Sequence, residues 1–488
     1  MKQPMFHRRV DPSARWLAAA CAALLSACAA GPDYQRPDSA SPAAFKEAPA
    51  ADAGWFAAAP ADALDRGPWW RLFGDADLDA LVEQVEVSNQ NIAAAVASYA
   101  QARALVREQR AALFPQLSLD GSANRSGGGG SGNATSTSLR GTSTSLQLGV
   151  GASWEPDLWG RLGRGVESAQ ASAQASDADL AAARLSAQSE VATNYFSLRD
   201  ADTELALLRS TVEGYERALT ITQNRYNAAI APKTDVLQAQ TQLANARADL
   251  SALVNQRAQS EHAIAVLLGK APAEFSLPVK SWNMAVPAVP LVVPSELLQR
   301  RPDIASAERA VAAANAQIGI QRSAYFPSLS LSASYGNAGS RVSDLFGAST
   351  SLWSMGLSVA QTLFDAGATR ARVEGAEASR DASVARYRQT VLVAFQEIEN
   401  QLSATRALSE QAELRRTASE AADLTEQQLL NRYKAGQVSY TDVVTAQASA
   451  LSARRTLSQL ASSRQAAAIG LIVALGGGWH APVDATLR

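Results

Sequence analysis

Few side chains in this sequence are arranged for catalysis. The 488 residues include three histidines, His7, His262 and His480, which are scattered and lack the neighbours that a catalytic or metal site needs. There is no phosphate-binding Gly-rich motif and no Gly-x-Ser-x-Gly element, and the glycine run at 127–130 suits a surface loop. The net charge of -2 gives no polybasic surface for nucleic acid. We therefore predict a protein that is not an enzyme, holds no metal or cofactor, and binds no nucleic acid.

Cys28 is the residue with the clearest chemistry. It ends the sequence Leu-Ser-Ala-Cys at 25–28, directly after basic residues and a short apolar run at 16–25. That run is too short to cross a bilayer, which takes about 20 residues, so residues 1–27 are predicted to be a signal peptide. The sequence resembles the bacterial lipobox, in which the cysteine is lipidated and becomes the first residue. The alternative is an ordinary signal peptide with a chance cysteine. Ala29, in place of Asp, favours the outer membrane.

A segment containing Arg, Tyr and Asp occurs twice, about 207 residues apart. Residues 224–236 match 431–443, and the register continues without gaps to Gly269 and Gly476. A second block, 112–119, matches 324–331. The chain is therefore predicted to consist of two copies of one unit.

The predicted divisions are a signal peptide (1–27), an N-terminal anchor and outer wrapping segment (28–70), a first repeat (71–269), a Pro-rich connector (270–294), a second repeat (295–476) and a C-terminal tail (477–488).

Each copy is predicted to run helix, strand, loop, strand, long helix, turn, helix. In the first copy a helix over 75–113 ends at Phe114-Pro115, because proline disfavours helical geometry in the residue before it. Alternating apolar residues predict strands at 117–123 and 146–154 around a Gly/Ser/Thr loop at 126–145. The second copy has strands at 329–335 and 353–359 around a loop at 336–350.

A proline-free run from about 157 to 228 predicts one very long helix. Apolar residues alternate spacings of three and four in its second half, which indicates a coiled-coil seam. The predicted seam residues are Leu205, Leu208, Val212, Tyr215, Leu219, Thr222 and Tyr226, continued by Val236, Ala239, Leu243, Ala246, Leu250 and Leu253. In the second copy they are Val443, Ala446, Ala450, Ala453, Leu457 and Leu460. Seventy residues at about 1.5 Å each give roughly 100 Å, the scale of a periplasm.

Four strands are too few to close a membrane barrel, which needs at least about eight in a single bacterial chain. Three chains related by cyclic symmetry would supply twelve. The predicted fold class is therefore mainly α with membrane β: a tandem-repeat helix–strand protomer in a trimeric twelve-stranded β-barrel, continued by a long periplasmic α-helical barrel.

The sequence resembles the outer-membrane factor (TolC-like) family, in the lipoprotein branch of resistance-nodulation-division and nodulation-type efflux channels. The features that carry the resemblance are Cys28, Gly31-Pro32-Asp33-Tyr34, Trp69-Trp70 with Phe73, Phe114-Pro115 with Phe326-Pro327, the segment at 154–161, and the paired Arg-Tyr turns. The resemblance implies a homotrimer in the outer membrane of a Gram-negative bacterium, lipid-anchored and extending into the periplasm. It also implies a periplasmic adaptor (membrane fusion protein), an inner-membrane pump, and a passive exit duct for small molecules.

The resemblance also suggests where the gate and the adaptor contacts lie. The periplasmic entrance corresponds to the turns at 228–234 and 435–441. Tyr433 and Asp442 match gate positions, whereas Val438 and Thr445 stand where relatives carry an Arg and a second Asp. The residues that match the adaptor-contact tips are Ala435, Gly436, Gln437, Val438, Ala228 and Ala229.

The residues themselves leave alternatives open. Three Asp442 carboxylates near an axis would form an acidic ring, but Asp442 and Asp235 could equally cap or begin their helices. Tyr433 could be a seam residue alone, whereas Gly436 suits the left-handed position of a tight turn. Since Ala229 replaces that glycine in copy one, we place the moving gate on copy two. The alternatives to an efflux duct are a type I secretion duct and a non-conducting lipid-anchored coiled-coil stalk.

Replacing Cys28 by Ala should abolish incorporation of labelled palmitate, because the thiol is the acceptor of the lipid. The measurement is metabolic labelling followed by gel autoradiography. Continued labelling of Cys28→Ala would contradict the anchor.

Overall fold

The computed structural model describes residues 30–39, 42, 44–48, 68–127, 142–280, 282, 285–287, 289 and 301–477. Cys28, the predicted signal peptide and nearly all of the predicted tail lie outside these residues. The chain divides into two compact units. The first comprises residues 1–37, 99–175 and 307–387, and the second comprises 38–98, 176–306 and 388–488.

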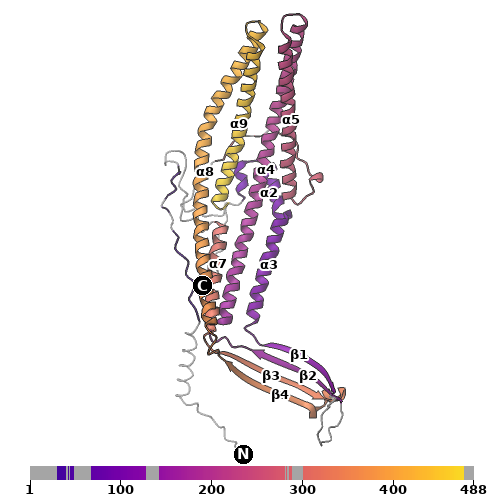
Figure 1. Cartoon of the computed structure of the whole chain (residues 1–488), viewed down its shortest axis with the longest axis vertical. Helices are drawn as coiled ribbons and strands as arrows, with labels where there is room; N and C mark the ends of the chain where they lie inside the picture. Colours follow the sequence, from indigo (N-terminus) through magenta and orange to yellow (C-terminus); the bar gives the residue numbers. More distant parts are fainter. Residues whose placement is uncertain are drawn as a thin grey trace, which may run out of the picture. The chain divides into compact units, whose positions relative to one another are not determined.

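The first unit contains a four-stranded antiparallel sheet with strands in the order β1-β2-β3-β4 (Figure 1). The strands are β1 (Gln116–Gly127), β2 (Thr142–Trp154), β3 (Ser328–Gly339) and β4 (Ser351–Ala360). All four predicted strands are present and are longer than predicted, because Gly, Ser and Thr residues continue the ladders. Two 3-10 turns, η4 (Val342–Phe346) and η5 (Ala348–Thr350), lie within the second predicted loop.

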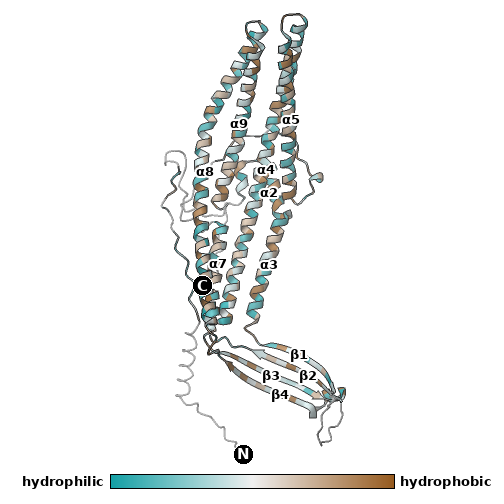
Figure 2. Ribbon diagram, in the orientation of Figure 1, coloured by the Kyte–Doolittle hydropathy of each residue, from teal (hydrophilic) through white to brown (hydrophobic). Residues whose placement is uncertain are grey.

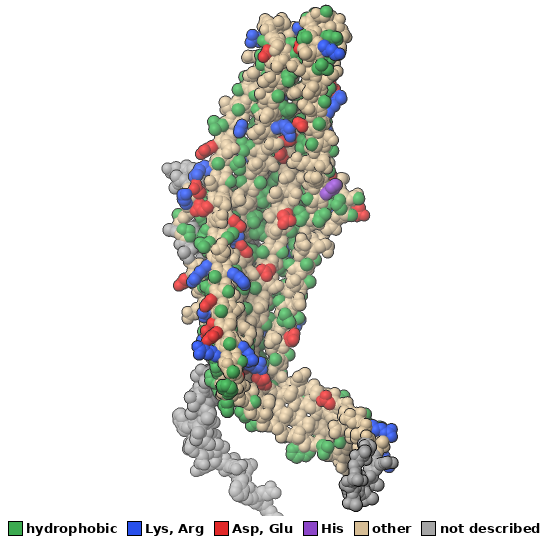
Figure 3. All heavy atoms as spheres, in the orientation of Figure 1, with side chains coloured by type: hydrophobic (Ala, Val, Ile, Leu, Met, Phe, Trp, Pro, Cys, Tyr) green, Lys and Arg blue, Asp and Glu red, His purple; other side chains and the backbone are tan. Residues whose placement is uncertain are grey.

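The two faces of the sheet differ sharply in chemistry. Leu119, Val150, Tyr335 and Trp353 are successive cross-strand partners and form a row on one face. This face is apolar and exposed; Trp353, for example, is 74% exposed. The opposite face carries mainly Ser and Gly, and Figure 3 shows few charged side chains over the middle of the sheet. A sheet with one apolar and one polar face fits a boundary between lipid and water.

The helices pair in the same way in both repeats. In Figure 1, α4 (Arg161–Asn227) runs beside α5 (Lys233–Leu267), and α8 (Ala368–Lys434) runs beside α9 (Tyr440–Ala474). α4 and α8 have 67 residues each, and α5 and α9 have 35 each. At about 1.5 Å per residue the longer helices measure roughly 100 Å. In Figure 2 hydrophobic and hydrophilic residues alternate in short bands along these helices, as in coiled coils.

The remaining elements are shorter. They are η2 (Trp69–Phe73), α2 (Ala76–Ser88), α3 (Gln90–Ala111), η3 (Pro272–Glu274) and α7 (Pro302–Ser323). No helix in the described part of the chain has both the length and the apolar character needed to cross a membrane.

The predicted single helix over 75–113 is wrong, because the backbone breaks at Asn89. This residue adopts an extended conformation and its side-chain oxygen accepts hydrogen bonds from the N–H groups of Asn91 (2.9 Å) and Ile92 (3.1 Å). It therefore caps a new helix, α3. Its amide also donates to the Leu267 carbonyl at the end of α5 (2.7 Å).

The second repeat contains an equivalent contact. Arg301, just before α7, donates to the Ala474 carbonyl at the end of α9 (3.2 Å). It also pairs with Glu397 of α8 (2.6 Å). In both repeats, a side chain preceding the short helix therefore satisfies a carbonyl that the helix end leaves unpaired.

The predicted coiled-coil seam is largely buried. Leu205, Leu208 and Leu253 belong to one cluster of buried side chains, and Tyr215 and Leu243 to another. Tyr226 differs from this prediction. Its side chain is 40% exposed, close to the turn that follows α4.

The N-terminal segment contacts the residues before α4 and the helix α7 within the first unit. The Ala30 N–H donates to the Trp159 carbonyl (3.0 Å), and the Tyr34 hydroxyl donates to Glu308 (2.9 Å). The Trp159 ring in turn stacks on Phe326 of the second repeat at 4.8 Å. The chain is therefore held at a residue only two positions after Cys28.

Replacing Asn89 by Ala should lower stability by about 1–2 kcal/mol, because a helix cap and the partner of a buried carbonyl are lost together. The thermal unfolding midpoint in detergent, followed by circular dichroism, would report the loss. Asn91→Ala is the matched control, because Asn91 is exposed and should leave the midpoint unchanged. Equal midpoints for the two variants would contradict the assigned role.

Candidate functional site: the two helix turns

The two long hairpins turn with the same backbone geometry. In the first, the Ile230 N–H donates to the Arg225 carbonyl (2.8 Å) and the Ala229 N–H to Tyr226 (2.9 Å). In the second, Gln437 and Gly436 make the corresponding bonds at 2.9 Å. This double pattern is the Schellman motif, which ends a helix by placing one residue in the left-handed conformation.

The residue in that left-handed position differs between the copies. Gly436 has a φ of 76° and Ala229 a φ of 61°. Because alanine has a Cβ that approaches the following carbonyl in this conformation, it costs about 1–2 kcal/mol there. The first turn is therefore strained where the second is not.

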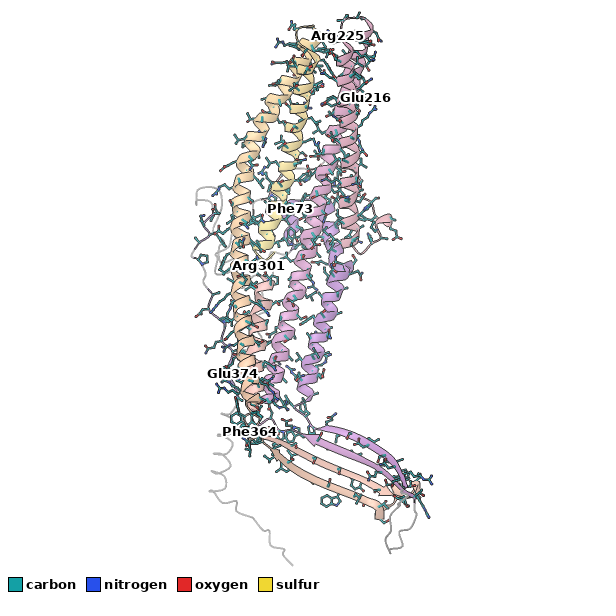
Figure 4. The ribbon with its side chains drawn as sticks, in the orientation of Figure 1. Phe73, Glu216, Arg225, Arg301, Phe364 and Glu374 are labelled. Carbon is teal, nitrogen blue, oxygen red and sulfur yellow. The ribbon has the colours of Figure 1, made fainter. Side chains whose placement is uncertain are left out.

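A side-chain contact joins the two hairpins beside these turns. The Arg225 guanidinium of α4 lies over the ring of Tyr433 in α8, 4.6 Å from its centroid, and donates to the Tyr433 carbonyl (3.1 Å). Figure 4 shows Arg225 near the end of α4 that leads into the turn. The Tyr433 hydroxyl donates to Asp235 in the first turn of α5 (3.4 Å). A cation, a ring and a carboxylate thus connect copy one to copy two.

Tyr433 is buried in a small cluster. Its ring lies 5.2 Å from that of Tyr440, and both side chains pack with Ala239 and Val443. Burial, followed by the charge of Asp235, raises the pKa of Tyr433. Burial also raises the pKa of Tyr440 to about 12. Both hydroxyls therefore stay protonated at neutral pH and can act as donors.

Asp442 forms a capping box with Ser439. The Ser439 N–H and hydroxyl donate to the Asp442 carboxylate at 3.1 and 2.7 Å, and the Asp442 N–H donates back to the hydroxyl at 3.4 Å. The helix-starting role considered for Asp442 is therefore present. The side chain remains exposed, so its charge stays available to other groups. Asp235 makes no such cap, because Pro232 precedes α5.

The predicted tip residues lie together at the two turns. Ala228, Ala229, Ala435, Gly436 and Gln437 are exposed, and Val438 is half-buried. A groove of about 560 Å³ lies between α8 and α9. It is lined by Asp442, Thr445, Val438, Leu429 and Ala446, among other residues.

Arg225 and Asp235 are partners of Tyr433 that were not predicted from the sequence. The signal for Arg225 was present, because each repeat carries an Arg-Tyr pair, at 225–226 and at 432–433. The structure uses the Arg of the first pair and the Tyr of the second. Such a mixed pairing cannot be read from either repeat alone.

Comparison with known proteins gives consistent matches over nearly the whole chain. The family model described as outer membrane efflux protein matches residues 81–270 and 293–477. The cation efflux system protein CusC of Escherichia coli O6:H1 is 31% identical over 464 residues, covering 94% of this chain and 98% of CusC. A probable efflux pump outer membrane protein of Pseudomonas putida, TtgC, is 31% identical over 463 residues and covers 95% of each chain.

A solved structure shows the same fold. The outer-membrane channel OprN superposes with a TM-score of 0.82 at 32% identity, covering 93% of this chain and 100% of OprN.

Replacing Ala229 by Gly should stabilise the first turn by about 1 kcal/mol, because glycine adopts the left-handed conformation without a Cβ clash. Thermal unfolding in detergent should show a higher midpoint. Gly436→Ala should lower the midpoint by a similar amount. If Ala229→Gly were neutral or destabilising, alanine would not be strained at this turn.

Proposed function

The chain belongs to the outer membrane efflux protein family, and from this membership we propose how it works. It is an outer-membrane efflux channel, as the resemblance predicted. We propose that three copies assemble around one axis. Each copy would contribute four strands to a closed barrel and two helical hairpins to a tube.

The observation that carries this proposal is the two-faced sheet. In the described part of the chain, β1 and β4 each have one hydrogen-bonded neighbouring strand, so each leaves one edge of polar backbone groups open. An unpaired backbone group in hydrocarbon costs several kcal/mol, so the edges must be closed by other strands. Joining β4 of one copy to β1 of the next closes them. The apolar face would then contact lipid, and the Ser/Gly face would line the lumen.

We propose a lipid anchor on Cys28, near the N-terminus of the chain. It is supported by the lipobox-like sequence and by the hydrogen bond between Ala30 and Trp159, which holds the chain two residues after the cysteine. Acyl chains contribute about 0.8 kcal/mol per buried CH₂, so several chains hold a protein firmly in a membrane.

We propose that a periplasmic adaptor and an inner-membrane pump complete the system and that the duct itself is passive. The curated relatives are named as efflux proteins, which supports this function over type I secretion or a non-conducting stalk. Their names describe different cargo, cations for CusC and toluene for a TtgC of another Pseudomonas putida strain, on a shared fold. This variety supports a duct whose specificity comes from its pump. The exposed tip residues at the two turns are our proposed adaptor contacts.

We propose that the gate lies at the Tyr433 contact and that Asp442 faces the entrance. Arg225 and Asp235 belong to the first hairpin (α4 and α5) and bind Tyr433 of the second (α8 and α9). Opening would therefore require the second hairpin to move away from the first. The unstrained Gly436 turn and the exposed carboxylate of Asp442 support placing the moving part on copy two.

Replacing Arg225 by Ala should raise the open probability about tenfold in planar bilayers, because a cation–π contact and a hydrogen bond together contribute about 1.4 kcal/mol to the closed state. Arg217→Ala is the matched control, because Arg217 is an exposed arginine of the same helix and pairs with the exposed Glu213 of that helix (4.0 Å). In the same recordings Asp442→Asn, which keeps an oxygen for the capping box, should weaken block by divalent cations.

Two outcomes would count against the proposal. The absence of discrete conductance in both the native protein and Arg225→Ala would reject the channel. Equal open probabilities for Arg225→Ala and Arg217→Ala would place the gate elsewhere.

A further inference from the structure

The Tyr433 contact uses only half of the residues that the duplication provides. Adding 207 to Arg225 and Asp235 gives Arg432 and Asp442, and the counterpart of Tyr433 is Tyr226. Each of these counterparts is the same residue type as the original. The chain therefore carries a complete second set of the three groups that hold the hairpins together.

Within one chain the second set is not assembled. Tyr226 is 40% exposed, and Arg432 and Asp442 are also exposed. In the described part of the chain, the side chains of Tyr226 and Arg432 make no hydrogen bond, ion pair or ring contact, and the Asp442 carboxylate bonds only Ser439 of its own turn. Tyr226 was predicted to be a buried seam residue, and its exposure is explained if a second chain covers it.

The groove between α8 and α9 lies where the second tyrosine should fit. In the assembled contact, Tyr433 packs on Ala239 and donates to Asp235. The repeat equivalents of these two residues, Ala446 and Asp442, both line the groove of about 560 Å³. The second hairpin thus offers an open version of the surface that Tyr433 occupies on the first.

We infer that Tyr226 of one copy occupies this groove on a neighbouring copy, with its hydroxyl on Asp442 and its ring under Arg432. This inference rests on the proposed trimer. Three chains with two equivalent hairpins each form a ring of six, in which contacts within a chain alternate with contacts between chains. The Arg225–Tyr433–Asp235 contact is the one within a chain, and the Arg432–Tyr226–Asp442 contact is the one between chains.

The two contacts differ in one respect that matters for opening. The Tyr440 ring lies 5.2 Å from that of Tyr433, and the repeat equivalent of Tyr440 is Lys233, in the turn after Tyr226. In the contact between chains, the cation of Lys233 therefore takes the place of the aromatic ring of Tyr440 and faces the carboxylate of Asp442. A more polar contact weakens as salt rises, because mobile ions screen exposed charges. Raising the ionic strength should therefore weaken the contact between chains more than the contact within a chain.

Cysteine pairs joined by a short bismaleimide test this arrangement in the full-length protein. Only Cys21 and Cys28 occur in the native sequence. Tyr226→Cys with Asp442→Cys should yield covalently linked trimers on denaturing gels. Tyr433→Cys with Asp235→Cys is the matched control and should react within one chain without raising its mass. Each single-cysteine variant should give monomers only.

A second pair leaves the three contact residues intact. Gln238 and Thr441 lie within hydrogen-bonding distance (3.3 Å) inside one chain, and their equivalents are Thr445 and Thr234. Thr445→Cys with Thr234→Cys should therefore also link chains.

In bilayers, Tyr226→Phe and Asp442→Asn should each raise the open probability several-fold, and the double variant should match the larger single effect.

The mass of the native protein in detergent separates the possible failures. A mass other than that of a trimer would reject the proposed function. A trimer in which both between-chain pairs fail to link, while the control pair reacts, would overturn this inference alone. Additive effects of Tyr226→Phe and Asp442→Asn would likewise show that the two side chains do not meet.

Discussion

The open edges of a four-stranded sheet are the constraint on which the rest of the structure depends. β1 and β4 each present a row of backbone N–H and C=O groups with no strand partner among the described residues. Water could satisfy these groups, but the apolar face of the same strands fits lipid, where water is absent. The sheet is therefore stable in a membrane only as part of a larger closed sheet. The need for further strands therefore follows from hydrogen-bond chemistry, before any helix contact is considered.

The internal duplication determines how the helices meet that requirement. Because α4 with α5 repeats as α8 with α9, one chain presents two nearly equivalent hairpins. They are not identical: Ala229 stands opposite Gly436, and Lys233 opposite Tyr440. In the proposed trimer, equivalent positions would allow the same contact geometry to form both within a chain and between chains. The differences let the two uses have unequal strength, which a channel that must open can exploit.

Much of this architecture could be predicted from the sequence. The four strands, the long helices and both turns were predicted, because alternating residues, proline-free runs and a fixed repeat spacing can be read directly from the sequence. The family resemblance rested on short motifs, such as the one at Cys28 and the paired Arg-Tyr turns. The break at Asn89 was missed. Apolar periodicity runs through it, and its cause is the distant carbonyl of Leu267. Arg225 was missed for a related reason: its partner Tyr433 lies 208 residues away and belongs to the other repeat.

The equal lengths of the paired helices have a consequence for how such chains can evolve or be redesigned. The two longer helices match residue for residue, as do the two shorter ones. An insertion in one hairpin alone would carry its turn beyond the plane of the other and separate Arg225 from Tyr433. Changes of length are therefore tolerated only as matched sets of whole coiled-coil repeats in all four helices. The length of the hairpins therefore sets the length of the duct. A duct for a deeper or shallower cell envelope would have to be lengthened or shortened in both copies together.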